Sequence, residues 1–282
     1  MNSFIIISQQ KKWKFKHQRS KGVSGKMVNN DRQVVIITGA NNGIGFHMAS
    51  ALLDEGYRVA AFDLAGDNLE ELQKSFPDNL LFCKTDVTQD LEVRESVEKV
   101  IQKWGQIDIL VNNACLAIFA PFEMKDIEDT RREFEVNYFG YVRMINAVLP
   151  YMKARRKGII HNVSSGVGIT GFPGIYGYSS TKGAIEALTL TLSYEFAQYG
   201  ISITVMHPPL TNTKSASPLG IPSQVMADPS DVGRALAKKI LSTKWVITPN
   251  LQTRIYLFFA RRFPHAIGKL MGKMTEREKR KS

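Results

Sequence analysis

Short apolar runs rich in β-branched residues alternate with longer amphipathic stretches, and this alternation constrains the fold more than any other feature of the chain. Such runs predict buried strands, here over residues 34–38, 58–63, 80–84, 107–111, 158–163 and 201–206. Helical spacing separates them over residues 43–56, 67–75, 89–104, 126–154 and 176–199. Strands joined through helices require a parallel sheet covered on both faces. The sequence therefore predicts a doubly wound α/β sheet with its ligand site at the carboxyl ends of the strands.

The formal net charge of +11 is concentrated at the two ends of the chain. Residues 1–26 hold seven Lys or Arg and no acid, residues 254–282 hold nine against two acids, and the remainder carries a net −3. A mildly acidic body argues against a nucleic-acid-binding face, so we expect no nucleic-acid partner. The alternative is that the two basic tails, the first of which contains Trp13 and Phe15, bind single-stranded nucleic acid.

The same charge distribution predicts the domain organisation. We expect residues 1–30 to be a basic tail, residues 31–250 to form one α/β domain, and residues 251–282 to be a basic amphipathic extension. A second interpretation is that translation starts at Met27. No apolar segment approaches the roughly 18–20 residues of a membrane-spanning helix. Two cysteines and five scattered histidines favour a reducing, cytoplasmic location and no metal site.

The loop after the first expected strand is rich in glycine and opens a helix. Its sequence, Thr38-Gly39-Ala40-Asn41-Asn42-Gly43-Ile44-Gly45, allows a tight turn that brings a helix N-terminus close to a phosphate. An ordinary strand–helix connection can also contain such a turn. The strand before it and the helix after it are, however, the context that a dinucleotide site needs.

Acidic residues follow the next two expected strands. Asp63 lies about twenty residues beyond the glycine-rich turn, where a carboxylate accepts the ribose hydroxyls of NAD and repels the 2′-phosphate of NADP. No basic residue occurs in 39–45 or 60–66, so we expect NAD(H) to be preferred, without excluding NADP(H). Asp86 and Val87 follow the third strand and are expected to meet the adenine.

A tyrosine and a lysine on one helical face form the most specific pair. Tyr178 and Lys182 are four residues apart, so the ammonium is expected near the phenol oxygen. A nearby cation is expected to lower the pKa of the phenol and make Tyr178 a general acid or base. Alone, the pair would fit a solvated helix face better than a catalytic site. Ser165, directly after the fifth strand, supplies a hydroxyl that can hydrogen-bond a substrate oxygen. Its presence favours a catalytic role for the pair.

Together these motifs resemble the short-chain dehydrogenase/reductase family, in its conventional Tyr-x-x-x-Lys form, over residues 34–210. The resemblance implies a Rossmann fold and catalysis by Ser165, Tyr178 and Lys182, with a fourth catalytic residue, Asn137, positioning a water. The cofactor contacts expected from the resemblance and from the strand ends are Gly39, Asn41, Asn42, Gly43, Ile44, Gly45, Asp63, Asp86, Val87, Asn113, Ala114, Tyr178, Lys182, Pro208, Thr211 and Thr213.

Two residues depart from the family pattern. Cys115 replaces the glycine of Asn-Asn-Ala-Gly, and Pro209 replaces the glycine of the usual Pro-Gly pair after the sixth strand. The first is expected to alter the wall of the pocket beside the cofactor, and the second to stiffen the loop that closes over the nicotinamide. Neither removes a catalytic group, so an active NAD(P)-dependent oxidoreductase is favoured over a non-catalytic nucleotide-binding or scaffold protein.

The segments expected around the pocket, 116–120, 167–172 and 175–176, are apolar and uncharged. They favour a hydrophobic alcohol or ketone as substrate, such as a steroid, a retinoid or a long-chain lipid, unless they only form the core of the fold. Apolar residues interleaved with Lys and Arg in 251–282 fit a helix on the cytosolic face of an anionic membrane. The alternative is a helix packed on the body or in the interface of the homodimer or homotetramer that the family resemblance implies.

Overall fold

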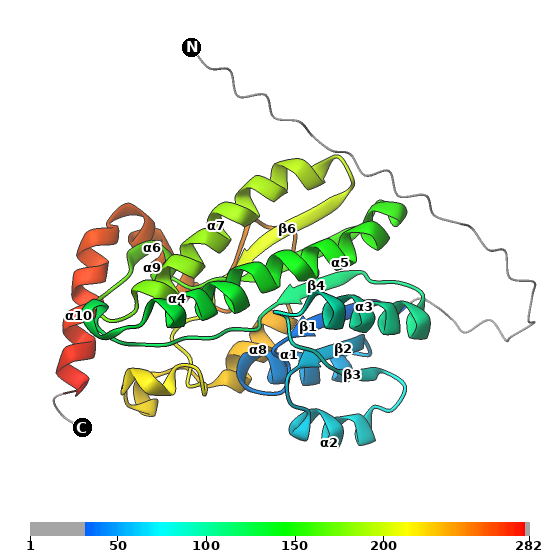
Figure 1. The fold of residues 1–282 in the computed structure, drawn as a ribbon, viewed down its shortest axis with the longest axis horizontal. Coiled ribbons are helices and arrows are strands. Elements are labelled where there is room, and N and C mark those ends of the chain that lie inside the picture. Colours follow the sequence, from blue (N-terminus) through cyan, green and yellow to red (C-terminus); the bar gives the residue numbers. More distant parts are fainter. Residues whose placement is uncertain (1–31, 280–282) are drawn as a thin grey trace, which may run out of the picture. The chain divides into compact units, whose positions relative to one another are not determined.

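A seven-stranded parallel sheet forms the centre of the computed structural model, which describes residues 32–279 of the chain and side chains as far as residue 275 (Figure 1). The strand order is β3-β2-β1-β4-β5-β6-β7, and every neighbouring pair is parallel. The predicted doubly wound sheet is confirmed, with its topological switch point between β1 and β4. The strands are β1 Val34–Thr38, β2 Arg58–Asp63, β3 Leu80–Lys84, β4 Ile109–Asn112, β5 Gly158–Val163, β6 Ile201–Met206 and β7 Val246–Ile247.

Helices connect the strands and cover both faces of the sheet (Figure 1). A π-helical turn, Glu135–Phe139, joins the fourth helix to the fifth. The helices are α1 Gly43–Asp54, α2 Asp67–Ser75, α3 Asp90–Trp104, α4 Ile127–Phe134, α5 Gly140–Arg155, α6 Val167–Thr170, α7 Tyr176–Ala197, α8 Pro229–Ala237, α9 Leu251–Arg262 and α10 Pro264–Lys279.

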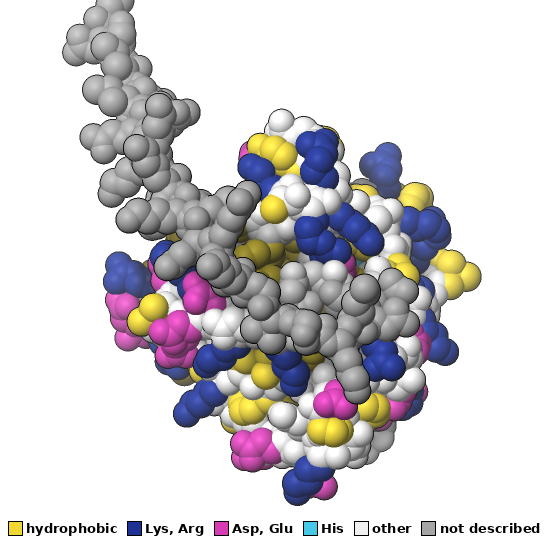
Figure 2. Space-filling model, turned by 90° about the vertical axis from the view of Figure 1, so that its right-hand side faces the viewer, with side chains coloured by type: hydrophobic (Ala, Val, Ile, Leu, Met, Phe, Trp, Pro, Cys, Tyr) yellow, Lys and Arg dark blue, Asp and Glu magenta, His cyan; other side chains and the backbone are white. Residues whose placement is uncertain are grey.

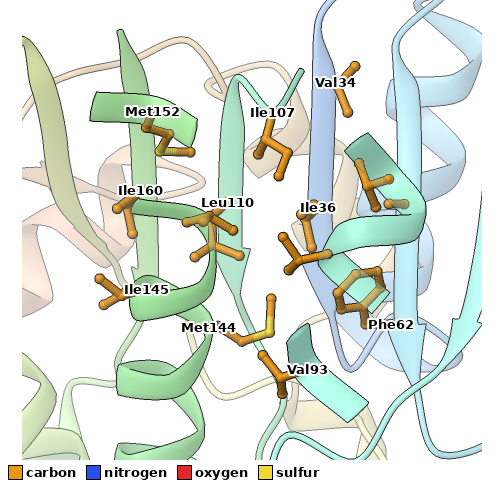
Figure 3. Packing of buried hydrophobic residues seen from close by; sticks show 14 of the residues in the cluster. Val34, Ile36, Phe62, Val93, Ile107, Leu110, Met144, Ile145, Met152 and Ile160 are labelled. Carbon is orange, nitrogen blue, oxygen red and sulfur yellow. The ribbon is translucent and has the colours of Figure 1, made fainter. Parts of the chain in front are cut away.

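Alternate residues of β1 pack into two hydrophobic cores, one on each face of the sheet. Val34 and Ile36 belong to the core that α3 and α5 complete, whereas Val35 and Ile37 belong to the core that α1 and α8 complete. Figure 3 shows the first core, where side chains from the sheet meet those of α3 and α5. Because successive side chains point to opposite faces and both faces are covered, the strands appear in the sequence as continuous apolar runs.

The structure differs from the sequence expectation in several details. Strand β7 has only two residues, too few for a periodicity in the sequence to reveal. The π turn divides the helix expected over 126–154 into α4 and α5, and β4 begins at Ile109 rather than at residue 107. The expected basic tail, residues 1–30, lies outside the described residues.

The last two helices, α9 and α10, pack against α6 beside the carboxyl end of the sheet (Figure 1). Glycines allow the close approach, since a Cβ added at Gly268 would lie 2.7 Å from the Thr170 carbonyl oxygen and one at Gly272 would lie 2.9 Å from Pro173 Cδ. None of the helices in residues 32–279 has both the length and the apolar character that crossing a membrane requires.

Candidate active site

Two hollows open at the carboxyl ends of the strands. The first has a volume of about 510 Å³ and its lining includes Ser165 and Tyr178. The second, also about 510 Å³, is lined by Gly39 and Asp63 among others. Cys115 lines both hollows, so they adjoin at the loop after β4. Two adjoining spaces at the switch point offer room for the two nucleotide halves of a dinucleotide.

The glycine-rich turn after β1 is packed too closely to accept side chains. Gly39 has φ +64°, and a Cβ there would lie 2.8 Å from Ala114 Cα. A Cβ at Gly45 would overlap the Gly39 carbonyl oxygen, and Gly43 has φ +56°. The N-terminus of α1 therefore approaches the first hollow, which Ile44 lines. A helix N-terminus at this place favours an anion such as a pyrophosphate.

Asp63 ends β2 at the second hollow, together with Asp86 and Val87 from the loop after β3. Its Oδ2 accepts a hydrogen bond from the backbone N–H of Asn41 at 2.9 Å. The Asn41 side chain is buried, and its Oδ1 accepts from the backbone N–H of Asn68 at 3.0 Å. The side-chain amide of Asn41 therefore ties the turn to α2, and the expected contact of Asn41 with the cofactor stays a prediction.

Asn113 and Ala114 connect the loop after β4 to the turn after β1. The Asn113 Nδ2 donates to the carbonyl oxygens of Thr38 and Gly39, both at 3.0 Å. The Thr38 hydroxyl accepts from the N–H groups of Asn113 and Ala114, each at 3.0 Å. These bonds join the loop after β1 to the loop after β4. The two hollows meet beside these loops.

The side chains of Tyr178 and Lys182, both on α7, meet Ser165 at the end of β5. The Tyr178 hydroxyl lies beside the side chains of Ser165 and Cys115, and both side chains influence its pKa. Lys182 Nζ lies 5.6 Å from the centroid of the Tyr178 ring and donates to the Val163 carbonyl oxygen at 2.9 Å. The phenol, the ammonium and the hydroxyl thus converge in the structure as their spacing in the sequence predicts.

Burial raises the pKa of the Tyr178 phenol well above its usual value, and the nearby Cys115 thiol raises it further, whereas the Ser165 side chain lowers it. Burial also lowers the pKa of the Lys182 ammonium. Desolvation of the phenolate is the largest influence on the pKa of Tyr178. The expectation that Lys182 lowers the pKa of the phenol stays a prediction.

Asn137 lies in the π turn between α4 and α5, a type of irregularity that is frequent at functional sites. Its Nδ2 donates to the Leu116 carbonyl oxygen at 2.8 Å and to the Thr181 hydroxyl at 3.0 Å, and its Oδ1 accepts from the Leu116 N–H at 2.8 Å. The buried amide therefore joins the loop after β4 to α7 beside Lys182. Its expected role in positioning a water stays a prediction.

The loop after β6 closes the first hollow and connects it to charged groups. His207 Nε2, at the start of this loop, lies 2.9 Å from Glu186 Oε1 on α7, and Glu186 Oε2 lies 3.3 Å from Arg261 Nη2 on α9. The loop, the helix that carries Tyr178 and the C-terminal helices are thus linked through one carboxylate. The loop residues that line the hollow include Pro208, Pro209, Thr211 and Thr213.

A buried ion pair between Lys125 and Glu133, here called the loop clamp, was not expected from the sequence. Both charged groups are fully buried and in direct contact. Glu133 Oε1 accepts from the Ile118 N–H at 2.8 Å, and Lys125 Nζ donates to the Ile118 carbonyl oxygen at 2.7 Å. The clamp therefore fixes the backbone between Ala117 and Phe119, which both line the first hollow.

The C-terminal helices also supply part of the wall of the first hollow. Thr253, Tyr256 and Leu257 of α9 and Met271 of α10 line it. Sequence reasoning missed this role because the inner apolar positions of these helices alternate with exposed apolar positions. The close contact of α9 with the loop after β5 is visible at Gly166, where an added Cβ would lie 2.5 Å from Tyr256 Cε1.

Residues 33–221 match the sequence profile of the family described as short chain dehydrogenase. The chain belongs to the short-chain dehydrogenase/reductase family. Among the curated relatives of this short-chain dehydrogenase, the 3-ketodihydrosphingosine reductase of Bacteroides thetaiotaomicron is 34% identical over 181 residues. That alignment covers 64% of this chain but only 65% of the relative, slightly less than two thirds of its length. The 3-oxoacyl-[acyl-carrier-protein] reductase FabG of Thermotoga maritima is 36% identical over 184 residues, which are 64% of this chain and 75% of that protein.

Solved structures show the same fold. A short-chain dehydrogenase from Streptomyces avermitilis aligns with a TM-score of 0.75 and 26% identity, over 89% of this chain and 98% of that chain. The 3-ketoacyl-(acyl-carrier-protein) reductase from Brucella melitensis, complexed with NADH, has a TM-score of 0.70 and 26% identity over 77% and 96% of the two chains. ElxO with NADP bound has a TM-score of 0.69 and 26% identity, with the same coverage. The short-chain dehydrogenase is therefore an oxidoreductase with a nucleotide-binding Rossmann fold.

Proposed function

We propose that this short-chain dehydrogenase reduces a hydrophobic ketone or aldehyde to the alcohol, with NAD(H) as the preferred cofactor. The observation that carries this proposal is that Tyr178 and Ser165 together line a mostly apolar hollow at the carboxyl ends of the strands, with Lys182 Nζ 5.6 Å from the centroid of the Tyr178 ring. A protonated acid beside the reacting oxygen suits carbonyl reduction at neutral pH, whereas alcohol oxidation needs the phenolate.

The residues of the two hollows fit a dinucleotide. A Cβ at Gly39 or Gly45 would clash with neighbouring backbone, so only glycine fits at these two positions. The absence of side chains there would let a pyrophosphate approach the N-terminus of α1 closely. Asp63 would accept the ribose hydroxyls in the second hollow, and Thr211 and Thr213 would hold the carboxamide at the first. The bound nicotinamide supplies the hydride chemistry, and the protein supplies geometry and charge.

The protein groups divide the remaining work. Ser165 orients the carbonyl oxygen of the substrate by a hydrogen bond, and Tyr178 donates its phenolic proton to that oxygen as negative charge develops on it. Lys182 would bind a ribose hydroxyl of the cofactor and would keep a positive charge close to the phenol. Asn137 and the loop clamp position the loop after β4, so the reacting groups stay in place without reorganisation.

The shape and lining of the first hollow support a hydrophobic substrate. Its walls are mostly apolar and include Phe119, Phe172, Ile175 and Leu257, while Ser165 and Tyr178 are among its polar lining residues. The ring of Phe119 stands edge-on to the ring of Tyr178, with centroids 6.0 Å apart, so one wall is aromatic close to the reacting oxygen. A relative at 34% identity bears the name of a reductase for a long-chain ketone, which agrees with this substrate class.

The substitution Tyr178→Phe tests the proposal directly. It removes the proton donor and keeps the ring, so kcat for a hydrophobic ketone should fall by roughly 10²- to 10⁴-fold, while the Kd for NADH stays within a few-fold of that of the unaltered protein. Ketone reduction is measured by NADH absorbance and binding by NADH fluorescence. Tyr194→Phe, an exposed tyrosine on the same helix, is the matched control. If the unaltered protein binds NADH but reduces no member of a panel of hydrophobic ketones, the non-catalytic alternative holds.

The substitution Asp63→Asn tests the cofactor preference. It removes the negative charge but retains an oxygen that accepts the Asn41 N–H. The ratio of kcat/KM with NADH to kcat/KM with NADPH is expected to fall by about 10-fold or more, since a hydrogen bond to a charged group contributes roughly 1.5–3 kcal/mol. Asp67→Asn, an exposed carboxylate at the start of α2, is the control. An unaltered protein that prefers NADPH would overturn the assignment of Asp63.

A further inference from the structure

The outer face of α9 and α10 exposes an unusual amount of apolar surface. Seven of the eighteen large apolar side chains that are exposed in the described part of the chain lie between residues 251 and 274. We call them the outer face, and they are Leu251, Ile255, Phe258, Phe259, Phe263, Leu270 and Met274. The most exposed of them, Leu251 and Phe258, expose 69% and 67% of their surface. Clustering of this kind marks an interaction site rather than scattered surface residues.

Helix α9 has two apolar sides, of which packing on the protein uses one. Thr253, Leu257 and Ala260 are buried, and the helical repeat places them opposite Leu251, Ile255 and Phe258. A helix that only packs on its own domain needs one apolar side, and its other side is normally polar. The second apolar side of α9 therefore requires a separate explanation, which a partner outside the described residues supplies.

The charges around the outer face have a single sign. Residues 251–275 contain five Lys or Arg and no Asp or Glu. Of these five cations only Arg261 has an ion pair among the described residues, with Glu186. Arg254, Arg262, Lys269 and Lys273 flank the apolar side chains and are exposed. On the face that is turned away from α10, in contrast, acidic side chains lie among the basic ones (Figure 2).

We propose that the outer face of α9 and α10 docks on the surface of an anionic lipid bilayer, with its apolar side chains in the acyl boundary and its cations among the headgroups. Exposed aromatic and aliphatic groups flanked by cations are what an interfacial helix requires. A second copy of this chain is a poorer occupant. A two-fold symmetric contact would bring the same cations face to face, with no carboxylate within 251–275 to compensate them.

The same two helices separate the outer face from the candidate active site. Tyr256, Leu257 and Met271 line the first hollow from the inner sides of α9 and α10. Docking through the outer face would therefore place the bilayer against one wall of the hollow and shorten the path for a lipid-dissolved substrate. This consequence rests on the proposed function, whereas docking itself needs neither substrate nor cofactor.

Flotation of the full chain with vesicles tests the docking. Vesicles of phosphatidylcholine alone are compared with vesicles of phosphatidylcholine and phosphatidylserine, without cofactor or substrate. The unaltered protein is expected to float with the anionic vesicles and much less with the neutral ones. Lys269→Gln with Lys273→Gln should weaken partitioning into the anionic vesicles by roughly 10- to 30-fold. Lys99→Gln with Lys238→Gln, which removes two exposed lysines elsewhere, should leave it unchanged.

The apolar contribution is tested in the same way. Leu251→Ser with Phe258→Ser should abolish flotation, whereas Leu64→Ser with Leu91→Ser, at positions of similar exposure on other elements, should not. Two results would overturn the proposal: equal flotation with neutral and anionic vesicles, or unchanged flotation of the outer-face variants. If instead Leu251→Ser with Phe258→Ser converts a dimer to a monomer in sedimentation and no variant floats, the outer face is an interface between copies. Reductase assays on soluble ketones report separately on the proposed function.

Discussion

Cys115 shows how one residue changes the chemistry of a familiar arrangement. It stands where the family pattern has glycine, lines both hollows, and influences the pKa values of both Tyr178 and Lys182. Its position next to Asn113 and Ala114 could be read from the sequence, but its contacts could not. They depend on how the loop after β4 lies against α7. A glycine would leave the phenol and the ammonium without this neighbour.

Replacing Cys115 should therefore shift the pH dependence of the reaction. Burial and the thiol both raise the pKa of Tyr178, and oxidation of an alcohol requires the phenolate. Without the thiol, the pKa of Tyr178 is lower, so the rise of kcat/KM for alcohol oxidation should move to lower pH in Cys115→Ala. Ketone reduction requires the protonated phenol and should begin to fall at a lower pH in the same variant. Cys83→Ala, in β3, is the control, and superimposable pH profiles for all three proteins would contradict this account.

The residues at strand ends were the ones that the sequence could place. Asp63, Asp86 and Ser165 follow strands, and parallel strands bring such positions to one edge of the sheet. Asn41 fitted the same pattern, yet its side chain is used inside the protein by α2. Periodicity shows which residue is near the edge, whereas the direction of a side chain depends on hydrogen bonds made by packed neighbours.

At the scale of elements, the loop clamp illustrates what periodicity cannot reveal. Lys125 and Glu133 lie in a strongly charged stretch, around α4, that in the sequence resembles a solvated helix face. The π turn that follows α4 is a local irregularity between α4 and α5, and no pattern in the sequence reveals it. The regular strands and helices were predictable because long apolar repeats define them. The clamp was not, because its burial results from α7 and the loop after β4 covering it together.

The loop clamp should be costly to break from one side. Lys125→Met leaves the Glu133 carboxylate buried without its partner, so the free energy of unfolding should fall by about 3–5 kcal/mol. Lys125→Met combined with Glu133→Gln leaves no buried charge and keeps an acceptor for the Ile118 N–H, so it should be less destabilised than the single variant. Lys74→Met breaks an exposed pair with Glu71 and should leave the free energy of unfolding nearly unchanged. Urea unfolding measures the free energy of unfolding of all three variants. Equal losses would show that the buried position of the clamp does not make its ion pair more important for stability than an exposed one.

On the scale of the whole molecule, the sequence defined the sheet and its functional edge but not how the chain closes over that edge. Helices α9 and α10 were expected as an extension that either packs on the body or lies on a membrane. They pack on α6, as the first alternative predicts, and form one wall of the first hollow, which was not expected. The connection through Glu186 joins them to the loop after β6 and to the helix that carries Tyr178. Long-range contacts of this kind involve residues far apart in the sequence and have no local pattern. The cytoplasmic location and the oligomeric state stay predictions.

His161 makes the stability of the whole sheet depend on pH. Its ring is fully buried in β5, with Nδ1 2.6 Å from the Thr204 hydroxyl and Nε2 2.7 Å from the Ile240 carbonyl oxygen, and burial lowers its pKa from 6.5 to about 4. Between these two values the unfolded chain binds a proton that the folded chain does not. The free energy of unfolding should therefore decrease by about 3 kcal/mol as pH falls from 6.5 to 4. In His161→Gln this contribution disappears, whereas His265→Gln, an exposed control, keeps it. Urea unfolding between pH 4 and 6.5 measures this dependence. If the free energy of unfolding changes equally with pH in His161→Gln and in the unaltered protein, another group causes the acid sensitivity.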